Sequence, residues 1–347
     1  MNIRDFNTSK KVLVVAEIGN NHEGNFDVAK ELVLKAADCG VGAVKFQTFR
    51  TEHYISAEQE ERFAKVKSFE LSLKQFGELA ELAHSLGLLF ISTPFDIGSA
   101  IGLEDIVDAY KISSGDNDFY PLLARVAKTG KPTIVSAGGS DFKRIKRAVD
   151  YVNEQWKEGG VTSGQLAVLH CVSSYPVPFN QANLRSIFYL AEQFNGVEVG
   201  YSDHTEGVTA AMVAVAMGAS IVEKHFTLDK NYSDFRDHQL SADVKEMKEL
   251  VEGIVRVDKM LGEYGKAVQS SEEATVCVVR RSIAAGRAMT AGHVLTEDDL
   301  IWVRSAGGLV PGEEGGLVGK SLKHDILFGQ HILASDVKSG VRLKVVN

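Results

Sequence analysis

The sequence predicts an α/β fold, a TIM (β/α)8 barrel followed by a small C-terminal β-rich domain. Between residues 12 and 261, short apolar runs rich in β-branched residues alternate eight times with longer segments of helical period. A length of 347 residues suits one large and one small domain, and 44% hydrophobic with 24% charged residues is typical of a soluble globular protein. An open doubly wound sheet usually has fewer strands, so eight repeats favour the barrel.

Each predicted strand is followed by a segment of helical period. We expect strands over Val12–Ile18, Ala43–Thr48, Leu88–Ser92, Ala109–Ile112, Thr133–Ser136, Leu166–Cys171, Val197–Tyr201 and Ser220–Phe226. Apolar residues three and four positions apart predict helices that include Asp27–Cys39, Lys74–Leu86, Phe142–Gln155, Val208–Met217 and, as the last, Asp243–Leu261.

The barrel is expected to occupy residues 1–262. A polar segment without apolar periodicity, residues 263–276, follows as a linker. Residues 277–347 are expected to form the second domain. Short β-like runs at Val276–Ile283 and Ile301–Arg304 lie among turn-rich stretches there, which indicates a compact, mostly irregular β module.

Composition excludes several functions. The chain has 38 Lys and Arg against 46 Asp and Glu, so it lacks the basic surplus of a nucleic-acid binder, although a local lysine cluster can still bind a small anion. Three distant cysteines, Cys39, Cys171 and Cys277, indicate neither a disulfide framework nor a CxxC metal site, which fits a reducing compartment. We see no signal-peptide core and no run of roughly 18 apolar residues, so we expect a cytoplasmic protein without a membrane partner.

In a TIM barrel the chemistry lies at the C-terminal ends of the strands, and polar residues gather at those positions here. Lys45 and Gln47 alternate on one strand, so both should point into the barrel. A lysine such as Lys45 or Lys111 inside an apolar strand is costly to bury unless an anion or a carboxylate meets it. Two interpretations are open: an ion pair with Glu17 or Glu223, or a pocket for a phosphate or carboxylate. In such a pocket the donors would be Lys45, Lys111, Thr93, Ser114 and Ser136.

Two histidines, His204 and His225, end neighbouring predicted strands, so they can converge within reach of one metal ion. Imidazoles with oxygen partners suit Mn, Zn, Co or Fe and do not choose among them. Glu223, two positions before His225, adds an inward carboxylate to the same patch. A histidine pair that acts without metal is the alternative. The first strand lacks the His-x-His pattern of common metallohydrolase barrels, which counts against that class.

Taken in order, these strand ends resemble the sialic acid synthase family, phosphoenolpyruvate-condensing enzymes that make nine-carbon acidic sugars. The matching segments span the barrel: Ala16–His22, Val44–Thr48, Ser92–Asp96, Tyr110–Gly115, Leu169–Cys171 with Tyr175 and Pro176, Tyr201–Thr205 and Val222–Thr227. The tail resembles the family's antifreeze-like (SAF) module, similar to type III antifreeze protein, at Arg281–Ile283, Ala291–Leu300, Val318–Lys320 and Ile332. The resemblance covers nearly the whole chain.

The resemblance implies that His204 and His225 hold a divalent metal, Mn²⁺ first, with Co²⁺, Mg²⁺ or Zn²⁺ as alternatives. The metal polarises the aldehyde of an open-chain N-acetylated hexosamine such as N-acetylmannosamine; the methylene carbon of phosphoenolpyruvate attacks it, water adds and phosphate leaves. Glu223 or a metal-bound water accepts the proton, and Glu17 is placed with it among the catalytic residues. Phosphoenolpyruvate would contact Lys45, Thr93, Lys111, Ser114 and Ser202, and the sugar would contact Glu17, Gln47 and Tyr175.

The family typically forms a domain-swapped homodimer in which the SAF module covers the partner's barrel and supplies an arginine to the sugar. Arg304 matches that arginine; the alternative is a surface arginine of a small domain. Four places differ from the family pattern and are expected to touch the sugar, so the reaction type is predicted more firmly than the acceptor, and legionaminate- or pseudaminate-type precursors also fit. These places are Asp116 for Glu, Ser173 for Asn, Ala137–Gly139 for Thr-Gly-Met and Phe235–His238 for Gly-Pro-Asp-His.

Two further hypotheses stay open. A condensing enzyme for a seven- or eight-carbon keto acid would take a phosphorylated aldose; it would need extra basic residues, and the C-terminal module argues against it. A non-catalytic sugar- or ice-binding protein is suggested by that module alone. Loss of turnover without His204 and His225 would distinguish an enzyme from a binder.

Overall fold

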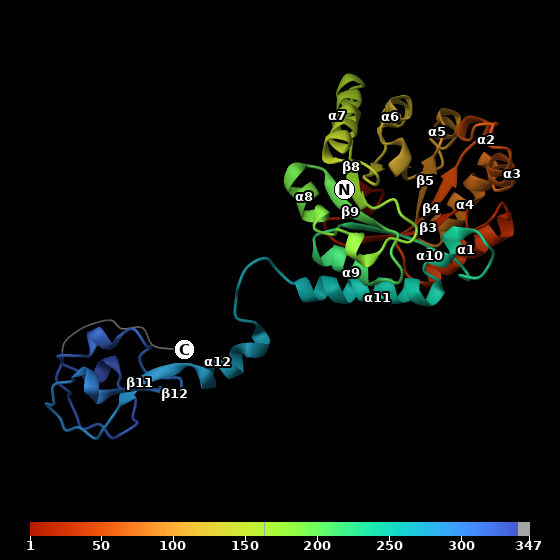
Figure 1. The fold of residues 1–347 in the computed structure, drawn as a ribbon. Coiled ribbons are helices and arrows are strands. Elements are labelled where there is room, and N and C mark those ends of the chain that lie inside the picture. Colours follow the sequence, from red (N-terminus) through yellow and green to blue (C-terminus); the bar gives the residue numbers. More distant parts are fainter. Residues whose placement is uncertain (163, 339–347) are drawn as a thin grey trace. The chain divides into compact units, whose positions relative to one another are not determined.

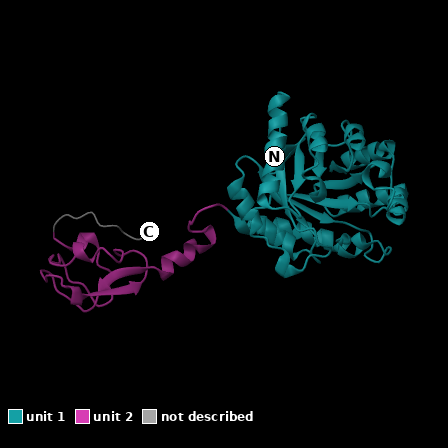
Figure 2. Cartoon of the chain, turned by 45° about the horizontal axis from the view of Figure 1, so that its top comes forward, with its two compact units in different colours: residues 1–262 teal, residues 263–347 magenta. Residues whose placement is uncertain are grey.

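The computed structural model describes residues 1–162 and 164–338, and the chain divides into two compact units, residues 1–262 and 263–347 (Figure 2). The last nine residues of the expected second domain, 339–347, lie outside the described residues. None of the helices among the described residues combines the length and apolarity that crossing a bilayer requires.

The first unit is the predicted TIM barrel: eight parallel strands close on themselves because β10 pairs with both β9 and β3 (Figure 1). The strands are β3 (Leu13–Gly19), β4 (Ala43–Thr48), β5 (Leu89–Pro94), β6 (Ala109–Ile112), β7 (Thr133–Ser136), β8 (Leu166–Cys171), β9 (Glu198–Asp203) and β10 (Ile221–His225). The helices are α1 (Phe26–Asp38), α2 (Thr51–Tyr54), α3 (Glu60–Ser68), α4 (Leu73–Ser85), α5 (Ile97–Gly102), α6 (Tyr120–Ala127), α7 (Phe142–Glu158), α8 (Ser186–Gln193), α9 (Thr209–Ala216), α10 (Arg236–Leu240) and α11 (Val244–Leu261).

The longer helices begin at side-chain caps and bury one stripe against the strands. Asn25 caps α1, and Ser72 with Gln75 forms a capping box at the start of α4. Asp243 and Glu246 form the same motif at the start of α11. In α1 the buried residues recur three or four positions apart, as a helix packed on a sheet requires: Ala29, Leu32, Val33 and Ala36.

An N-terminal hairpin, β1 (Asn2–Ile3) with β2 (Phe6–Asn7), adds to the apolar half of the barrel interior. Ile3 is fully buried in one cluster with inward residues from the beginnings of the strands, such as Leu13, Ala109 and Ile221. The hairpin was not predicted, because two strands of two residues carry no periodic signal. Apolar side chains fill most of this half, where Glu198 of β9 pairs with the amino group of Met1, and the buried Lys45, Lys111 and Glu223 lie nearer the C-terminal ends of the strands.

The second unit contains the antiparallel pair β11 (Arg281–Ala285) and β12 (Leu300–Arg304) around its own apolar core. The predicted β run Val276–Ile283 is partly wrong, because α12 (Glu273–Val279) precedes β11. A capping box at Gln269 starts a helical turn that continues into α12. None of the side chains of α12 is buried, so its valines lack the packing against neighbouring strands that stabilises β structure. The short 3-10 turns are η3 (Ser270–Glu272), η4 (Glu297–Asp299), η5 (Glu314–Gly316) and η6 (Ala334–Asp336).

Candidate active site

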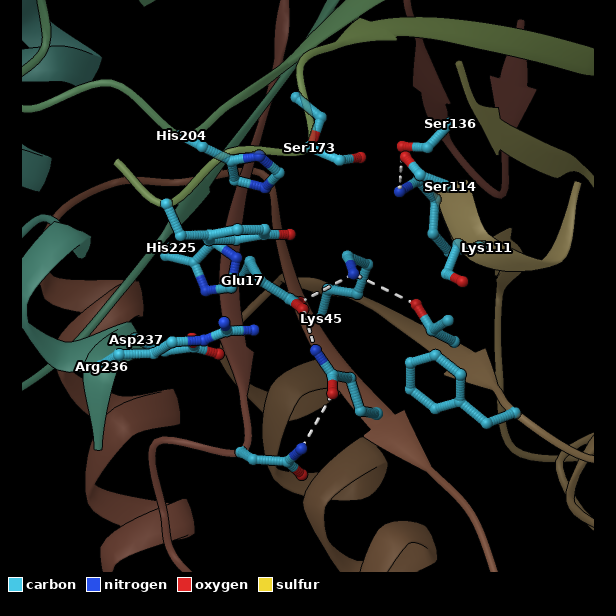
Figure 3. Close-up of a pocket in the computed structure, with 18 of the residues that line it drawn as sticks. Glu17, Lys45, Lys111, Ser114, Ser136, Ser173, His204, His225, Arg236 and Asp237 are labelled. Atoms are coloured by element: carbon cyan, nitrogen blue, oxygen red, sulfur yellow. Dashed lines mark hydrogen bonds and ion pairs between the residues drawn. The ribbon is translucent and has the colours of Figure 1, made fainter. Parts of the chain in front are cut away.

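A cavity of about 800 Å³ opens at the C-terminal ends of the barrel strands (Figure 3). This size is typical of a site for small molecules. Thirteen of the residues predicted from the sequence line it: Glu17, Lys45, Gln47, Thr93, Lys111, Ser114, Ser136, Ser173, Tyr175, Ser202, His204, Glu223 and His225. Asp116 is not among the lining residues and accepts a hydrogen bond from Ser113 instead. Arg304 belongs to the second unit, where it lies opposite Arg281 in the β11–β12 pair.

Two lysines and two glutamates form a buried charge network on the barrel floor, and Figure 3 labels Lys45, Lys111 and Glu17 among them. Lys45 Nζ lies 2.9 Å from Glu17 Oε2, without good hydrogen-bond direction, and 3.6 Å from Glu223 Oε2. Lys111 Nζ lies 3.3 Å from Glu223 Oε1. The ion pairs considered in the sequence analysis are therefore present, and the same lysines also line the cavity. Their burial alone does not require an anionic ligand.

The pKa shifts follow from burial and from these contacts. Burial opposes ionisation of Glu223, but Lys111 and Lys45 outweigh it and lower its pKa to about 2. Burial likewise opposes the charge of Lys45, yet the two glutamates raise its pKa. At Lys111 burial dominates and lowers the pKa, and the charge of Lys45 lowers it further, so that the opposing effect of Glu223 is outweighed. Lys111 therefore loses its proton more readily than Lys45.

Hydroxyl groups surround the lysines. Lys45 Nζ donates to Thr93 Oγ1 at 3.1 Å, and Lys111 Nζ donates to Ser136 Oγ at 2.8 Å. Ser202 Oγ donates to Glu223 Oε1 at 2.8 Å. These contacts orient the head groups toward one part of the floor, where together they can bind a phosphate or a carboxylate.

A second polar chain leads from the floor to a neighbouring wall. Gln47 Nε2 donates to Glu17 Oε1 at 3.1 Å, and Asn20 Nδ2 donates to Gln47 Oε1 at 2.8 Å. Asn20 was not predicted as a site residue, although it lies in the Ala16–His22 segment that carries the resemblance. A carboxylate and two amides provide donors and acceptors of the kind that sugar hydroxyls need.

The rings of the two histidines have centroids 5.4 Å apart, and both contact Tyr175, His204 at 4.2 Å and His225 edge-on at 6.2 Å. His204 Nδ1 donates to the Val172 carbonyl at 2.9 Å, so its Nε2 is left as an acceptor. His225 Nδ1 is buried and has no hydrogen-bond partner among the described residues. Burial lowers the pKa of His225 to about 3, so the ring is neutral, as a metal ligand must be.

These nitrogens fit a divalent metal as a two-histidine site. Burial disfavours charge on His204, while the Cys171 thiol and the Val172 carbonyl raise its pKa overall, so metal binding there competes with a proton. The described part of the chain has no cluster of three or more His, Cys, Asp or Glu side chains arranged around one ion. The other ligands of an ion bound here would have to be substrate oxygens or water.

The exposed edge of the cavity is formed by α3 and by the segment that leads into α10. Phe235 packs edge-on against Phe69 of the segment after α3, with centroids 5.2 Å apart. Arg236 lies over the ring of Tyr175 at 5.1 Å. Sequence reasoning noted the Phe235–His238 difference, but it missed α3, whose residues show no apolar stripe because none of them is buried.

Comparisons with known proteins give matches to both units of the chain. Residues 32–266 match the NeuB family, and residues 280–338 match the SAF domain. An N,N'-diacetyllegionaminic acid synthase of Campylobacter jejuni is 36% identical and covers 86% of this chain and 92% of its own. An uncharacterized protein of Methanocaldococcus jannaschii is 44% identical over 90% of both chains. A crystal structure of an N-acetylneuraminic acid synthetase from Leptospira borgpetersenii, in complex with citrate, has 33% identity and a TM-score of 0.73 over 80% of this chain and 94% of its own.

Proposed function

This chain belongs to the NeuB family, and from that premise we propose that it condenses phosphoenolpyruvate with N-acetylmannosamine or a related N-acetylated aldose. The products would be a sialic-acid-like nine-carbon keto acid and phosphate. The family's members are phosphoenolpyruvate-dependent condensing transferases that make nonulosonic acids, which removes the alternative of a non-catalytic binding protein. The observation that carries the proposal is the meeting of two lysines, their hydroxyl partners and a histidine pair in one cavity.

The floor lysines would hold the anionic groups of phosphoenolpyruvate. Lys45 and Lys111 supply two cations, with hydroxyls from Thr93, Ser136 and Ser202. A bound anion competes with Glu223 for both lysines, so binding would raise the pKa of this carboxylate from about 2 and make it a stronger base. Ser114 Oγ, which accepts from the Gly138 N–H at 3.1 Å, would complete the donors.

The acceptor sugar would lie between the histidines and the amide wall. A divalent ion held by His204 and His225 would polarise the aldehyde oxygen of the acceptor. Glu17 and Gln47 would bind the sugar hydroxyls, and the ring of Tyr175 would cover one face. The methylene carbon of phosphoenolpyruvate then forms a bond to the aldehyde carbon, and the aldehyde oxygen takes up a proton to become a hydroxyl. Water adds to the adjacent cationic carbon, and the bond from this carbon to the phosphate oxygen then breaks as the added hydroxyl loses its remaining proton, which gives the ketone and phosphate. Glu223 would accept the proton of that water.

The metal and the assembly complete the proposal. Members of the family typically use a divalent metal, and we propose Mn²⁺ here, with Co²⁺, Mg²⁺ or Zn²⁺ as substitutes.

We further propose a cytoplasmic, domain-swapped homodimer with a catalytic barrel at 1–262, a linker at 263–276 and an SAF domain at 277–347, in which Arg304 reaches the partner's sugar. Light scattering measures the mass of the assembly in solution, which should be twice that of the 37.7 kDa chain. Mixed dimers of a Glu223→Gln chain and an Arg304→Ala chain then test the exchange: a swapped dimer leaves both defects in the same site and one site intact, so activity survives.

Phosphate release from phosphoenolpyruvate tests the reaction. The assay would include Mn²⁺ and a panel of aldoses, with N-acetylmannosamine and 2,4-diacetamido-6-deoxyhexoses among them, and it would be repeated after chelation and metal replacement. We expect release that depends on both metal and acceptor. The proposal would be overturned if the protein is folded and loaded with metal but none of the aldoses in the panel supports phosphate release. His204→Ala combined with His225→Ala should abolish turnover.

A further inference from the structure

Three cationic side chains line the exposed edge of the cavity, and the mechanism above does not use them. Arg62 and Lys65 extend from α3, and Arg236 begins α10; together they are termed the cationic rim. Figure 3 shows Arg236 beside Asp237 on the same side of the cavity as His225. All three cations are exposed, so a ligand in the cavity can reach them.

Aromatic rings contact two of the three rim cations, and Arg62 donates to Gln59 Oε1 at 3.0 Å. Lys65 Nζ lies 5.3 Å from the centroid of Phe235, and Arg236 lies over Tyr175. In the described part of the chain, neither Arg62 nor Lys65 has a carboxylate within ion-pair distance. By contrast Lys67, on the same helix but outside the cavity, pairs with two glutamates at 2.8 and 3.1 Å.

The balance of charge differs between the floor and the rim. On the floor, Lys45 and Lys111 are matched by Glu17 and Glu223. At the edge, three cations face two carboxylates, Asp234 and Asp237. Asp237 approaches only Nε of Arg236, at 3.5 Å, which leaves the terminal amines of the guanidinium available. The rim therefore has a surplus of donors directed at the ligand space.

We propose that the acceptor sugar carries an anionic group, a phosphate or a carboxylate, at the end remote from its aldehyde, and that Arg62, Lys65 and Arg236 bind it. This inference rests on the proposed function, which places phosphoenolpyruvate on the floor and the aldehyde beside the histidines. The remote end of a hexose then faces the rim. A neutral acceptor would leave Arg62 and Lys65 without an anionic partner among the described residues.

Acceptor sugars that differ only at the end remote from the aldehyde test whether the enzyme prefers an anionic acceptor. Phosphate release would be measured with N-acetylmannosamine, its 6-phosphate and N-acetylmannosaminuronate, which share the aldehyde and the acetamido group. We expect at least one anionic sugar to have a kcat/KM about tenfold or more above that of N-acetylmannosamine, and we expect the advantage to shrink as salt is added. The phosphate and the uronate arms show which anion the rim prefers.

Variants assign the effect to the rim. Arg236→Met and Lys65→Met should each raise KM for the anionic sugar about tenfold and leave N-acetylmannosamine nearly unaffected, while Arg236→Lys should retain part of the preference. Lys67→Met is the matched control, because Lys67 lies on the same helix outside the cavity. It should leave KM unchanged for both the anionic sugar and N-acetylmannosamine. Equal or better use of the neutral sugar by the wild-type enzyme would overturn the inference.

Calorimetric binding of the three sugars separates this inference from the proposed function. If no sugar supports phosphate release, the proposed function fails. Tighter binding of an anionic sugar that is lost in Arg236→Met would still support the rim as its site. Equal binding of all three sugars, or binding insensitive to Arg236→Met, would overturn the rim's role as well.

Discussion

Gly138 lies beside two serine hydroxyls of the proposed pocket. A Cβ added there would lie 2.5 Å from Ser114 Oγ and 2.4 Å from Ser173 Oγ. Both are ends of small side chains that can rotate, so Gly138→Ala should displace the two hydroxyls and barely affect folding. We expect kcat/KM for phosphate release to fall about ten- to hundredfold, because small misplacements of positioning groups have effects of this size. The melting temperature should stay within a few degrees of wild type.

A second glycine provides the control for this variant. Gly77 lies in the middle of α4 and has nothing within 4 Å of an added Cβ. Gly77→Ala should raise the free energy of unfolding by about 0.5–1 kcal/mol and leave the kinetics unchanged. Wild-type kinetics in Gly138→Ala would show that Ser114 and Ser173 do not act on the substrate.

Lys224 and Asp203 form a fully buried ion pair next to the site, and each is the chain neighbour of one of the two histidines. Lys224 Nζ lies 3.0 Å from Asp203 Oδ2 and also donates to the Thr205 carbonyl. Lys224→Met would leave a buried carboxylate without its cation. We expect a loss toward the lower end of about 3–5 kcal/mol in urea unfolding, because Tyr201 and Thr205 still donate to Asp203.

A double variant separates the charge from the packing. Lys224→Met combined with Asp203→Asn should recover part of the stability, since it removes the unpaired charge as well. A loss below about 1 kcal/mol for Lys224→Met alone would contradict the account, because a buried pair broken on one side is strongly destabilising.

Residue positions in the site were predictable to the extent that strand alternation determines them. Lys45 and Gln47 share a face because side chains alternate along β4. Which carboxylate meets which lysine was not predictable, because the partners of Lys45 come from β3 and β10, strands far apart in the chain. The cationic rim was not predicted for a related reason: exposed cations on α3 have the same sequence pattern as any solvent-facing side of a helix.

At the scale of elements, strands were located closely and connections were not. The predicted strand at Ala43–Thr48 has the same bounds as β4, because β-branched and aromatic residues mark this run and strand alternation places Lys45 and Gln47 on one face of it. The hairpin of β1 and β2 and the helix α12 were missed, because short elements are specified by contacts or caps and not by periodicity. The short helices α2 and α3 were missed on the same ground.

One turn in the second unit is predicted to depend on a single carboxylate. Asp299, buried at the end of η4, accepts from Arg287 Nε at 2.8 Å, from Thr296 N and Oγ1 at 2.9 Å each, and from His293 Nε2 at 2.8 Å. Asp299→Asn weakens the charge-assisted bonds, so we expect this unit to lose about 2–3 kcal/mol of stability, measured by thermal unfolding near neutral pH.

The same carboxylate gives a pH dependence with a definite sign. Burial opposes its charge, but His293, Thr296 and Arg287 hold the pKa of Asp299 well below its ordinary value. The stabilisation is therefore complete above the pKa of about 3.9 in the unfolded chain and is lost progressively as pH falls below it. The stability gap between wild type and Asp299→Asn should therefore be constant near neutral pH and shrink progressively as the pH falls from about 5 toward 2. A gap that does not change with pH would contradict the ionic origin.

Among the described residues of the whole molecule, the hydrophobic clusters of the barrel share no residue with the core of the second unit. The barrel's clusters lie within residues 1–254, and the core of the second unit runs from Ile283 to Val337. Independent cores predict two transitions in calorimetry of the full chain, the larger from the barrel because unfolding enthalpy scales with the number of residues. Lys224→Met should lower only the larger transition, and Asp299→Asn only the smaller. One transition that both variants shift would show instead that the two units unfold as a single cooperative structure.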